Sequence, residues 1–478
     1  MAANMTDVDA VVVGSGPNGL VAAIKLAEAG VRVVVFEAAD QVGGGLRTEE
    51  LTLPGFRHDV CSTVQAIAQA SVAFRELDLE RDGLRYAHAP DPLGQTLAGS
   101  ASAILHRDID STASGLGRDG NAWRRLVGAV AARDTDVVDG LLSPLDTPPR
   151  HPISLAAFGI RGVWPASLVN SVVFREPPAR ALFAGVAAHA VLPLTQPATA
   201  GYAVMLAALA HSVGWPVAVG GSQSVADALA DRLRSLGGEI VTSTPVVSLE
   251  QLPSNRAVVM DVTPKQLVDI ARDNLPDRYR RRLTRFRYGP GVFKVDWALD
   301  APVPWSDDQL AGAGTVHVAG SADEIVSGER LVARGGHPSR PYVLFVQATV
   351  ADPSRAPAGQ HTGWAYCHVP NGSTVDMTDA IEGQLERFAP GFRDRVLARH
   401  VMGPAALEAH NANEVGGDIG GGAADIVQFA RRPVLSLDPW STPVPGLFLC
   451  SASTPPGGGV HGMGGYHAAR SALRYLGA

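Results

Sequence analysis

The chain is short of lysine and of cysteine. Lysine and arginine together number 40, and only three of them are lysines: Lys25, Lys265 and Lys294. The three cysteines are widely spaced and form no CxxC pair: Cys61, Cys367 and Cys450. This low, odd count argues against a disulfide framework and against a zinc site, so we expect no metal centre.

The sequence also lacks the marks of secretion and of membrane insertion. Its first residues have neither the basic region nor the apolar region of a signal peptide. No run reaches about 18 uninterrupted apolar residues, which a membrane-spanning helix needs. We therefore expect a cytoplasmic protein.

Positive charge is in deficit, with a net charge of −7 at pH 7. A nucleic-acid partner requires a basic footprint, so none is expected. The arginine-rich run at residues 278–287 is a local exception, which we interpret as a solvated helix face.

Charged residues are missing altogether from residues 181–226, which contain no Asp, Glu, Lys or Arg. Proline and glycine interrupt this stretch too often for it to cross a bilayer. Three interpretations stay open, namely buried core helices, the wall of an apolar cavity, or a peripheral contact with a membrane.

The N-terminal segment carries a nucleotide-binding pattern. Residues 9–13 form a β-branched apolar run, typical of a buried strand, and Gly14, Gly16 and Gly19 follow with GxGxxG spacing. A helical period and a second apolar run then lead to Glu37. Gly14 permits a tight turn, Gly16 lets a pyrophosphate approach the backbone, and Gly19 lets the helix pack close to the strand. The helix N-terminus attracts phosphate, and Glu37 can accept hydrogen bonds from ribose hydroxyls.

A glycine cluster shortly after Glu37 indicates which dinucleotide binds. Gly43, Gly44 and Gly45 precede Leu46 and Arg47. This order resembles the second signature of the two-dinucleotide-binding-domain flavoproteins, whose glycine pair and basic residue run along the FAD pyrophosphate. Gly45 stands where that superfamily often has arginine, so Arg47 is the candidate for the charge on the phosphates.

The middle of the chain changes from a helical to an α/β pattern. Residues 90–215 predict mostly helices with proline breaks. A helix at 224–236, a strand at 239–242 and a buried strand within 255–264 follow. These last segments are predicted to join the N-terminal strands in one nucleotide-binding layer.

The last third of the chain predicts a second sheet. Strand-like runs fill residues 289–370, and a helix follows within 378–390. The glycine-rich stretch 411–425 is equally compatible with a linker and with backbone that approaches the cofactor. A strand at 447–450 and a helix from about residue 464 close the chain, with the helix N-terminus directed at the flavin.

The two glycine signatures, residues 220–240 and 351–370, and the C-terminal segment TPVPGLFLCSASTPPGGGVHGMGGYHAA resemble the phytoene desaturase-like branch of the FAD-dependent amine oxidoreductases. The similarity spans nearly the whole chain. It implies an α/β, two-dinucleotide-binding-domain flavoprotein. Its discontinuous Rossmann-like FAD domain would comprise residues 1–80, 216–288 and 415–478, and its inserted α+β substrate domain residues 81–215 and 289–414.

The resemblance also assigns FAD as the cofactor and implies which residues hold it. These are Gly14, Gly16, Pro17, Asn18, Gly19, Glu37, Ala38, Gly43, Gly44, Gly45, Leu46, Arg47, Val246, Ser451, Ala452, Gly462, Met463 and Gly464. Many amine oxidoreductases carry an acid where Ser451 and Ala452 stand, and the desaturase-like members lack it as this chain does.

Lys294 is a candidate catalytic residue. Its segment, GPGVFKVDWALDAPVPW, looks like the stretch of monoamine oxidases in which a lysine holds a water near flavin N5. A cation there would stabilise negative charge on the reduced flavin or on superoxide. Strand alternation puts Lys294 and Asp296 on one face, so a surface ion pair is the alternative.

His461 is the second candidate catalytic residue. The resemblance places it near an aromatic residue that flanks the substrate in monoamine oxidases. It would shape the pocket or act as a base. The alternative is a histidine that caps a loop through hydrogen bonds.

Together these features predict an FAD-dependent oxidoreductase, either a dehydrogenase or desaturase or an oxidase, that transfers hydride from a C–H bond of an apolar substrate to flavin N5. The expected electron acceptor is O₂ or a quinone, and a homodimer is left open. Two alternatives are a flavin-dependent isomerase of a polyene and a lipid-binding chaperone of the same fold. The intact glycine motif and Glu37 argue against the chaperone.

Overall fold

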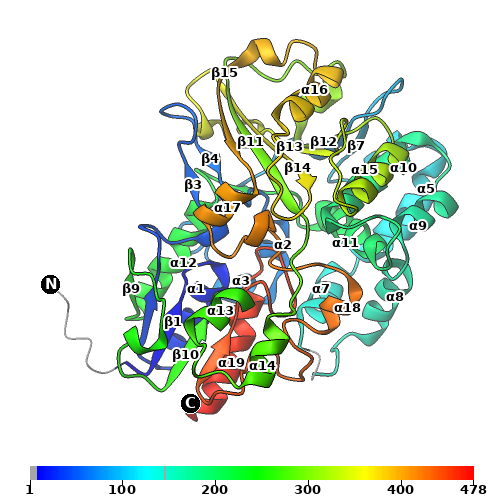
Figure 1. The fold of residues 1–478 in the computed structure, drawn as a ribbon. Helices are drawn as coiled ribbons and strands as arrows, with labels where there is room; N and C mark the ends of the chain where they lie inside the picture. The colour runs from blue at the N-terminus through cyan, green and yellow to red at the C-terminus, as the bar shows by residue number, and fades with distance from the viewer. Residues whose placement is uncertain (1–7, 145–146) are drawn as a thin grey trace.

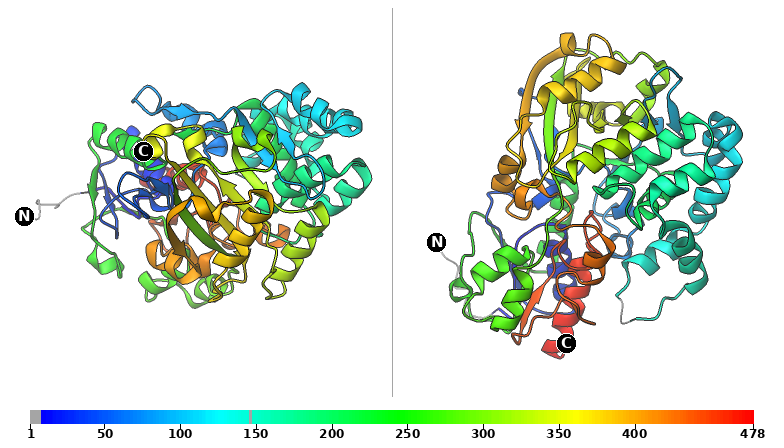
Figure 2. Two further views of the ribbon diagram at one scale, coloured as in Figure 1. Left: turned by 90° about the horizontal axis from the view of Figure 1, so that it is seen from above. Right: turned by 45° about the vertical axis from the view of Figure 1, so that its right-hand side comes forward.

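The computed structural model describes residues 8–144 and 147–478. Two β-sheets lie one above the other, and a helical region lies beside them (Figure 1). In the rotated views of Figure 2 the helical region, coloured cyan to green, stays to one side of the second sheet. The space where these three parts meet is the setting of the site described below.

The first sheet is parallel and has the strand order β16-β10-β1-β2-β9. Its strands are β1 (Ala10–Val13), β2 (Val33–Phe36), β9 (Glu239–Val241), β10 (Ala257–Met260) and β16 (Leu447–Leu449). Val11 is in register with Val34 on one side and with Val258 on the other. The predicted nucleotide-binding layer is therefore confirmed, because segments more than 200 residues apart supply adjacent strands.

Both faces of the first sheet are covered, which explains why its strands are continuous apolar runs. Val12 and its neighbours pack against α1 (Pro17–Glu28), α12 (Gln223–Ser235) and α19 (Met463–Leu476). Val11 and Val13 face the opposite way, toward α13 (Pro264–Ile270) and α14 (Asp277–Leu283). The arginine-rich run is the outer side of α14, since Tyr279 and Leu283 are buried and most of its arginines are exposed. The predicted solvated face is confirmed.

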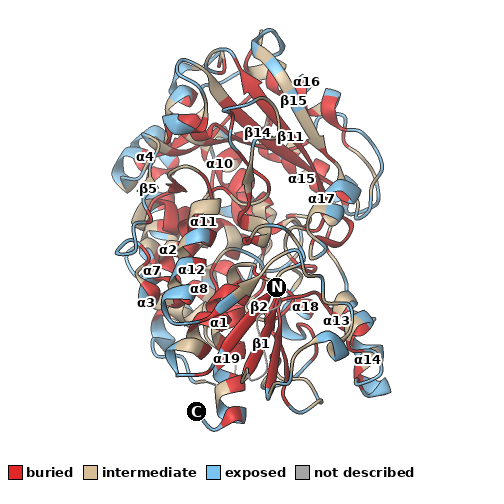
Figure 3. Cartoon of the chain, turned by 90° about the vertical axis from the view of Figure 1, so that its left-hand side faces the viewer, coloured by how far each residue is buried: buried red, intermediate tan, exposed pale blue. Residues whose placement is uncertain are grey.

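The second sheet is mixed and has the order β15-β11-β14-β13-β12-β6-β7. Its strands are β6 (Asp91–Gln95), β7 (Ala103–Leu105), β11 (Gly291–Leu299), β12 (Ala313–Val318), β13 (Val343–Val346), β14 (His361–Val369) and β15 (Val396–Met402). Trp297 and Phe345 pack against α16 (Thr378–Phe388) on the outer face. Figure 3 shows β11 and β14 buried like β1 and β2.

The helical region consists mainly of residues 109–212. Its helices are α4 (Ile109–Gly115), α5 (Gly120–Trp123), α6 (Ala129–Ala131), α7 (Asp134–Leu142), α8 (Pro152–Gly162), α9 (Ala166–Val173), α10 (Pro177–Ala187) and α11 (Thr199–Ser212). The uncharged stretch 181–226 forms most of α10 and α11, which are largely buried. Its membrane-contact interpretation is wrong, because these side chains pack against the second sheet and line the cavity.

Shorter elements connect these layers. They are α2 (Ala66–Ala70), α3 (Val72–Leu77), β3 (Thr48–Glu49), β4 (His58–Asp59), β5 (Tyr86–Ala87), β8 (Val217–Ala218), α15 (Ala322–Val332), α17 (Pro404–His410) and α18 (Ile426–Ala430). The strands of the first sheet come from the three stretches predicted as the FAD domain, and those of the second from the predicted substrate domain. The exact boundaries between the two domains stay a prediction.

Candidate cofactor and substrate site

A cavity of about 1410 Å³ lies between the two sheets and the helical region. Gly14, Glu37 and Asp261, which follow β1, β2 and β10, line one end of it. Ligands of parallel α/β sheets bind at this carboxyl edge. The cavity exceeds the roughly 300–1,000 Å³ of a single small-molecule site, so it has room for a dinucleotide and a second molecule.

The first glycine turn has the geometry that its sequence predicts. Gly14 has a φ of +97°, a conformation that favours glycine. A Cβ on Gly19 would lie 2.1 Å from the carbonyl oxygen of Gly14, so only glycine lets α1 begin so close to β1. The N–H of Gly19 donates to Oδ2 of Asp261 at 2.9 Å and is therefore not free for a phosphate. Pro17 and Asn18 line the cavity beside Gly16, whereas Gly19 lies behind its wall.

Glu37 is fixed at the end of β2, where a ribose is expected. Its Oε2 accepts from the N–H of Ser15 at 2.8 Å and from its hydroxyl at 2.6 Å. Its Oε1 accepts from the N–H of Ala39 at 2.8 Å. Ala38 and Val246 line the cavity next to it. These bonds orient the carboxylate, and each oxygen keeps accepting capacity for a ligand hydroxyl.

The second glycine cluster packs directly on the first turn. A Cβ on Gly44 would lie 3.1 Å from the Cα of Gly16. Gly44, Gly45 and Arg47 line the cavity, whereas Gly43 and Leu46 lie behind it. The guanidinium of Arg47 is buried and donates to the carbonyl oxygens of His410 at 2.7 Å and of Gly44 at 3.2 Å. Its remaining donors keep it a candidate for the phosphates.

Of the predicted cofactor-binding residues near the C-terminus, some line the cavity and others lie behind its wall. Ser451 and Ala452 line the cavity after β16. Gly462, Met463 and Gly464 begin α19 but are not part of the cavity wall. A Cβ on Gly464 would lie 2.4 Å from the carbonyl oxygen of Cys450, so this glycine serves close packing.

His461 is held by the loop before α19. Its Nδ1 accepts from the N–H of Met463 at 3.0 Å, so Nε2 carries the proton and donates to the carbonyl of Gly457 at 3.0 Å. Burial lowers the pKa of His461 to about 4. The side chain is neutral, engaged at both nitrogens and absent from the cavity wall. This geometry favours the loop-capping alternative, and the catalytic role of His461 stays a prediction.

Lys294 does not line the cavity itself but contacts Trp364, which does. It is paired with Asp296, and both side chains are almost fully buried, so the surface ion-pair alternative is wrong. The Lys294 ammonium lies 5.4 Å from the ring centroid of Trp364, which lines the cavity. His58 and His400 approach Asp296 at 3.6 and 3.9 Å. Lys294 is therefore a buried cation next to the cavity, in contact with its aromatic wall.

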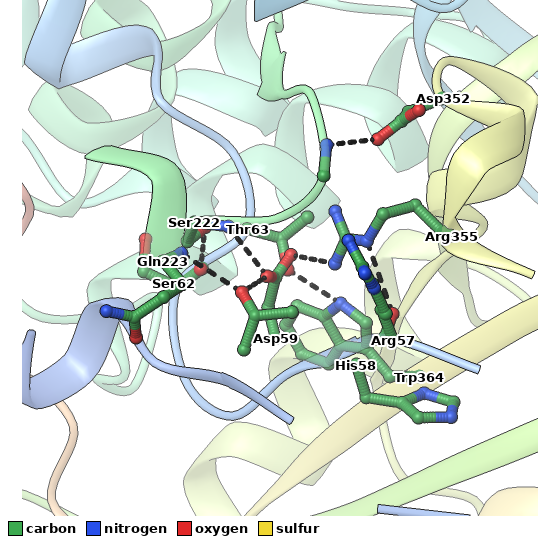
Figure 4. A network of polar contacts seen from close by, with 12 residues as sticks. Arg57, His58, Asp59, Ser62, Thr63, Ser222, Gln223, Asp352, Arg355 and Trp364 are labelled. Carbon is green, nitrogen blue, oxygen red and sulfur yellow. Dashed lines mark hydrogen bonds and ion pairs between the residues drawn. The ribbon is translucent and has the colours of Figure 1, made fainter. Parts of the chain in front are cut away.

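A polar network beside this pair fixes the aromatic wall (Figure 4). Arg355 forms a buried ion pair with Asp59 at 2.6 Å, and Asp59 also accepts from the N–H of Ser222 at 2.9 Å. Nε1 of Trp364 donates to the hydroxyl of Thr63 at 2.8 Å. Burial alone would raise the pKa of Asp59, but Arg355 and the hydrogen bonds hold it below its usual value. The network joins three segments that are distant in the sequence.

Two carboxyl groups in the cavity wall were missed by the sequence analysis. Burial raises the pKa of Asp261 to about 7 and that of Glu414 also to about 7. Glu414 accepts from Nδ2 of Asn411 at 3.1 Å and from the thiol of Cys61. Asp261 follows β10 directly, a position that could have identified it. Glu414 belongs to the glycine-rich stretch 411–425, several residues of which line the cavity, so the cofactor-approach interpretation fits better than a linker.

Comparisons with known proteins agree with this geometry. Residues 12–71 match a family model described as an NAD(P)-binding Rossmann-like domain. Pyridine nucleotide-disulfide oxidoreductase domain-containing protein 2 of Mus musculus is 27% identical over 98% of this chain and 94% of its own length. Phytoene dehydrogenase of Streptomyces griseus is 26% identical over 81% of this chain and 77% of its own length. Wild-type putrescine oxidase bound to putrescine shares the fold, with a TM-score of 0.62 at 17% identity over 98% of this chain and 99% of that chain.

Proposed function

We propose that the chain is an FAD-dependent oxidoreductase, like the phytoene desaturases and the flavin amine oxidases that it resembles, and that it oxidises a C–H bond of an apolar substrate. The observation that carries the proposal is one continuous cavity. Its nucleotide end is built from glycines and Glu37, and its far end from apolar and aromatic side chains such as Phe158, Met205 and Trp364.

The residues at the nucleotide end fit the cofactor. Gly14 and Gly16 line the cavity at the N-terminus of α1, where a pyrophosphate would bind, and their lack of a Cβ also makes room for Asp261. Glu37 would hold the ribose, and Arg47, which also lines the cavity, would add positive charge near the phosphates. When bound, FAD supplies a hydride acceptor at N5. The residues of the chain orient the substrate and exclude water from the cavity.

The far end of the cavity favours an apolar molecule. It is lined by α8, α11 and the inner face of β13 and β14, which contribute aliphatic and aromatic side chains and glycine but no charged residue. When a C–C single bond becomes a double bond, one hydrogen leaves as hydride and the other as a proton. Glu414 is our candidate for the group that accepts this proton, because burial raises its pKa to about 7. O₂ or a quinone is the proposed electron acceptor.

A second candidate substrate class is a primary amine. A charged amine requires a carboxylate, and the cavity wall contains Glu414. Asp418 is less suitable, since its two oxygens already accept from the N–H groups of Gly289 and Gly420. We rank the amine second because Glu414 is half protonated near pH 7 and the surrounding wall is apolar.

Anaerobic spectroscopy tests the proposal. We expect the purified protein to be yellow, and its flavin absorbance to bleach on addition of a suitable terpenoid or polyene but not of putrescine or other primary amines. Replacement of Glu414 by glutamine should slow the bleaching without removing the flavin. Turnover only after prior chemical reduction would favour the isomerase instead. A colourless protein that cannot be reconstituted with FAD would contradict the proposal.

Asp261 should make FAD binding depend on pH. Its Oδ2 lies at the N-terminus of α1, within 2.7 Å of a Cβ placed on Gly16, and its pKa is raised to about 7. Above that pH the carboxylate repels the pyrophosphate, whereas below it the neutral group does not. We expect the affinity of the apoprotein for FAD to fall about tenfold from pH 6 to pH 8. Fluorescence titration would measure this, and Asp261→Asn should flatten the profile.

A further inference from the structure

The mouth of the cavity is surrounded by exposed apolar side chains. On α8 and α9, Ile153, Ile160 and Val172 are 80%, 70% and 76% exposed. On the other side, the segment from α18 to residue 437 exposes further apolar side chains: Ile426, Val427, Phe429, Leu435 and Leu437. We call these two sets together the apolar rim. Clusters of this kind on one surface mark interaction sites.

The apolar rim is continuous with the interior of the cavity. Val163, Ile426 and Phe429 are exposed and also line the cavity. Leu155 and Phe158, on the inner side of α8, line it further in. Helices α8 and α18 both contribute residues to the cavity wall, and Figure 1 shows them on the same side of the molecule. An apolar molecule that entered between them would stay in contact with apolar side chains along its path.

The charge of the rim points to an anionic partner. Residues 147–175 contain three arginines and no Asp or Glu, although the whole chain has a net charge of −7. Residues 426–437 likewise contain no acid, and of their two arginines Arg431 is exposed whereas Arg432 is buried. The acids on either side of that segment are engaged, Asp425 with Arg287 and Asp438 with Arg474. Basic residues around an apolar face are typical of proteins that lie on anionic lipid surfaces.

The helices of the rim are too short to cross a bilayer. Within residues 8–144 and 147–478, no single helix is long and apolar enough for that. Only α8 and α9 taken together reach the length and composition, and they are bent by 84°. An 11-residue helix such as α8 extends about 16 Å, roughly half the hydrocarbon thickness. The bent pair is suited to lie in the interface.

We propose that the apolar rim is a membrane-contact face, which seats the cavity mouth on an anionic phospholipid surface. The apolar substrate of the proposed function then enters from the bilayer without crossing water. This inference concerns binding alone, so it stands or falls separately from the flavin chemistry.

Vesicle flotation tests the membrane-contact face. The full-length protein should float with phosphatidylcholine vesicles that contain phosphatidylglycerol, and less with phosphatidylcholine alone. The triple variant Ile153→Glu, Ile160→Glu and Val172→Glu should bind at least about tenfold more weakly, because charges replace apolar contacts. A matched control changes three exposed apolar residues elsewhere to glutamate: Leu331, Val375 and Leu397. It should bind like the unaltered protein.

Three outcomes would overturn the inference. The first is flotation that the rim variant and the control variant reduce equally, and the second is no flotation at all. The third is a dimer of the unaltered protein that the rim substitutions convert to monomers, with no vesicle binding. That result, measured by light scattering after size exclusion, would assign the apolar rim to a contact between two copies of the chain. An unchanged flavin spectrum and melting temperature would show that the rim variant is folded.

Discussion

Replacement of Lys294 by methionine is expected to lower the free energy of unfolding by about 3–5 kcal/mol, because it leaves Asp296 buried without its cation. Asp296 is fully buried, and the other basic side chains near it are His58 at 3.6 Å and His400 at 3.9 Å. Burial of His58 lowers its pKa to about 4, so it does not replace the lost positive charge near pH 7. Urea denaturation would measure the loss.

The chain offers a matched control in Lys265. That lysine pairs with Glu408 at 2.9 Å, but its side chain is 55% exposed. Lys265→Met should therefore cost about 1 kcal/mol or less. The double variant Lys294→Met and Asp296→Asn should recover part of the loss, since it removes both members of the buried pair. Equal stability of the Lys294 and Lys265 variants would contradict the importance of burial.

The same Lys294→Met variant tests a role in flavin reoxidation. The Lys294 ammonium lies against Trp364 at the cavity wall, where it adds positive potential to the site. We expect FAD to stay bound and O₂ to reoxidise the reduced flavin more slowly, because negative charge on the flavin or on superoxide loses a stabilising cation. Stopped-flow absorbance would follow the reaction. Unchanged reoxidation in the folded variant would leave Lys294 with a structural role only.

The sequence predicted best what is local. The strand predicted at residues 9–13 is β1, and the glycine turn, α1 and β2 follow it in the predicted order, because strand, glycine turn and helix each depend on neighbouring residues. Alternation along β11 correctly placed Lys294 and Asp296 on one face of the strand. It did not indicate whether that face is covered, since the covering residues, such as His58 and Trp364, come from elsewhere in the chain.

The parts of the site that were missed depend on contacts between distant segments. The ion pair of Asp59 with Arg355 joins residues almost 300 positions apart, and no local pattern indicates it. The pKa of Glu414 rises because the assembled fold buries it beside Cys61, which the composition of residues 411–425 does not reveal. The loop-capping bonds of His461 were also beyond the sequence, because its two hydrogen-bond partners are backbone groups of a loop whose path the sequence left open.

Gly465→Ala is the second substitution with a large expected effect. Helices α1 and α19 cross at this glycine, where an added Cβ would lie 1.8 Å from the carbonyl oxygen of Asn18 and 3.0 Å from the backbone nitrogen of Ala22. No rotamer change relieves a clash between backbones, so the two helices must separate. We expect the free energy of unfolding to fall by about 3 kcal/mol or more.

The damage should extend to the cofactor, because Asn18 belongs both to this helix crossing and to the cavity wall next to the glycine turn. A displaced α1 carries its N-terminal N–H groups away from the pyrophosphate. Gly383→Ala is the control, since Gly383 is exposed within α16 and an added Cβ there meets nothing within 4 Å. Alanine at that position should stabilise the protein by about 0.5–1 kcal/mol and leave FAD bound. Urea denaturation and flavin retention would be measured for Gly465→Ala and Gly383→Ala. Equal stability and equal flavin content of the two variants would contradict the idea that close packing of α1 on α19 positions the cofactor.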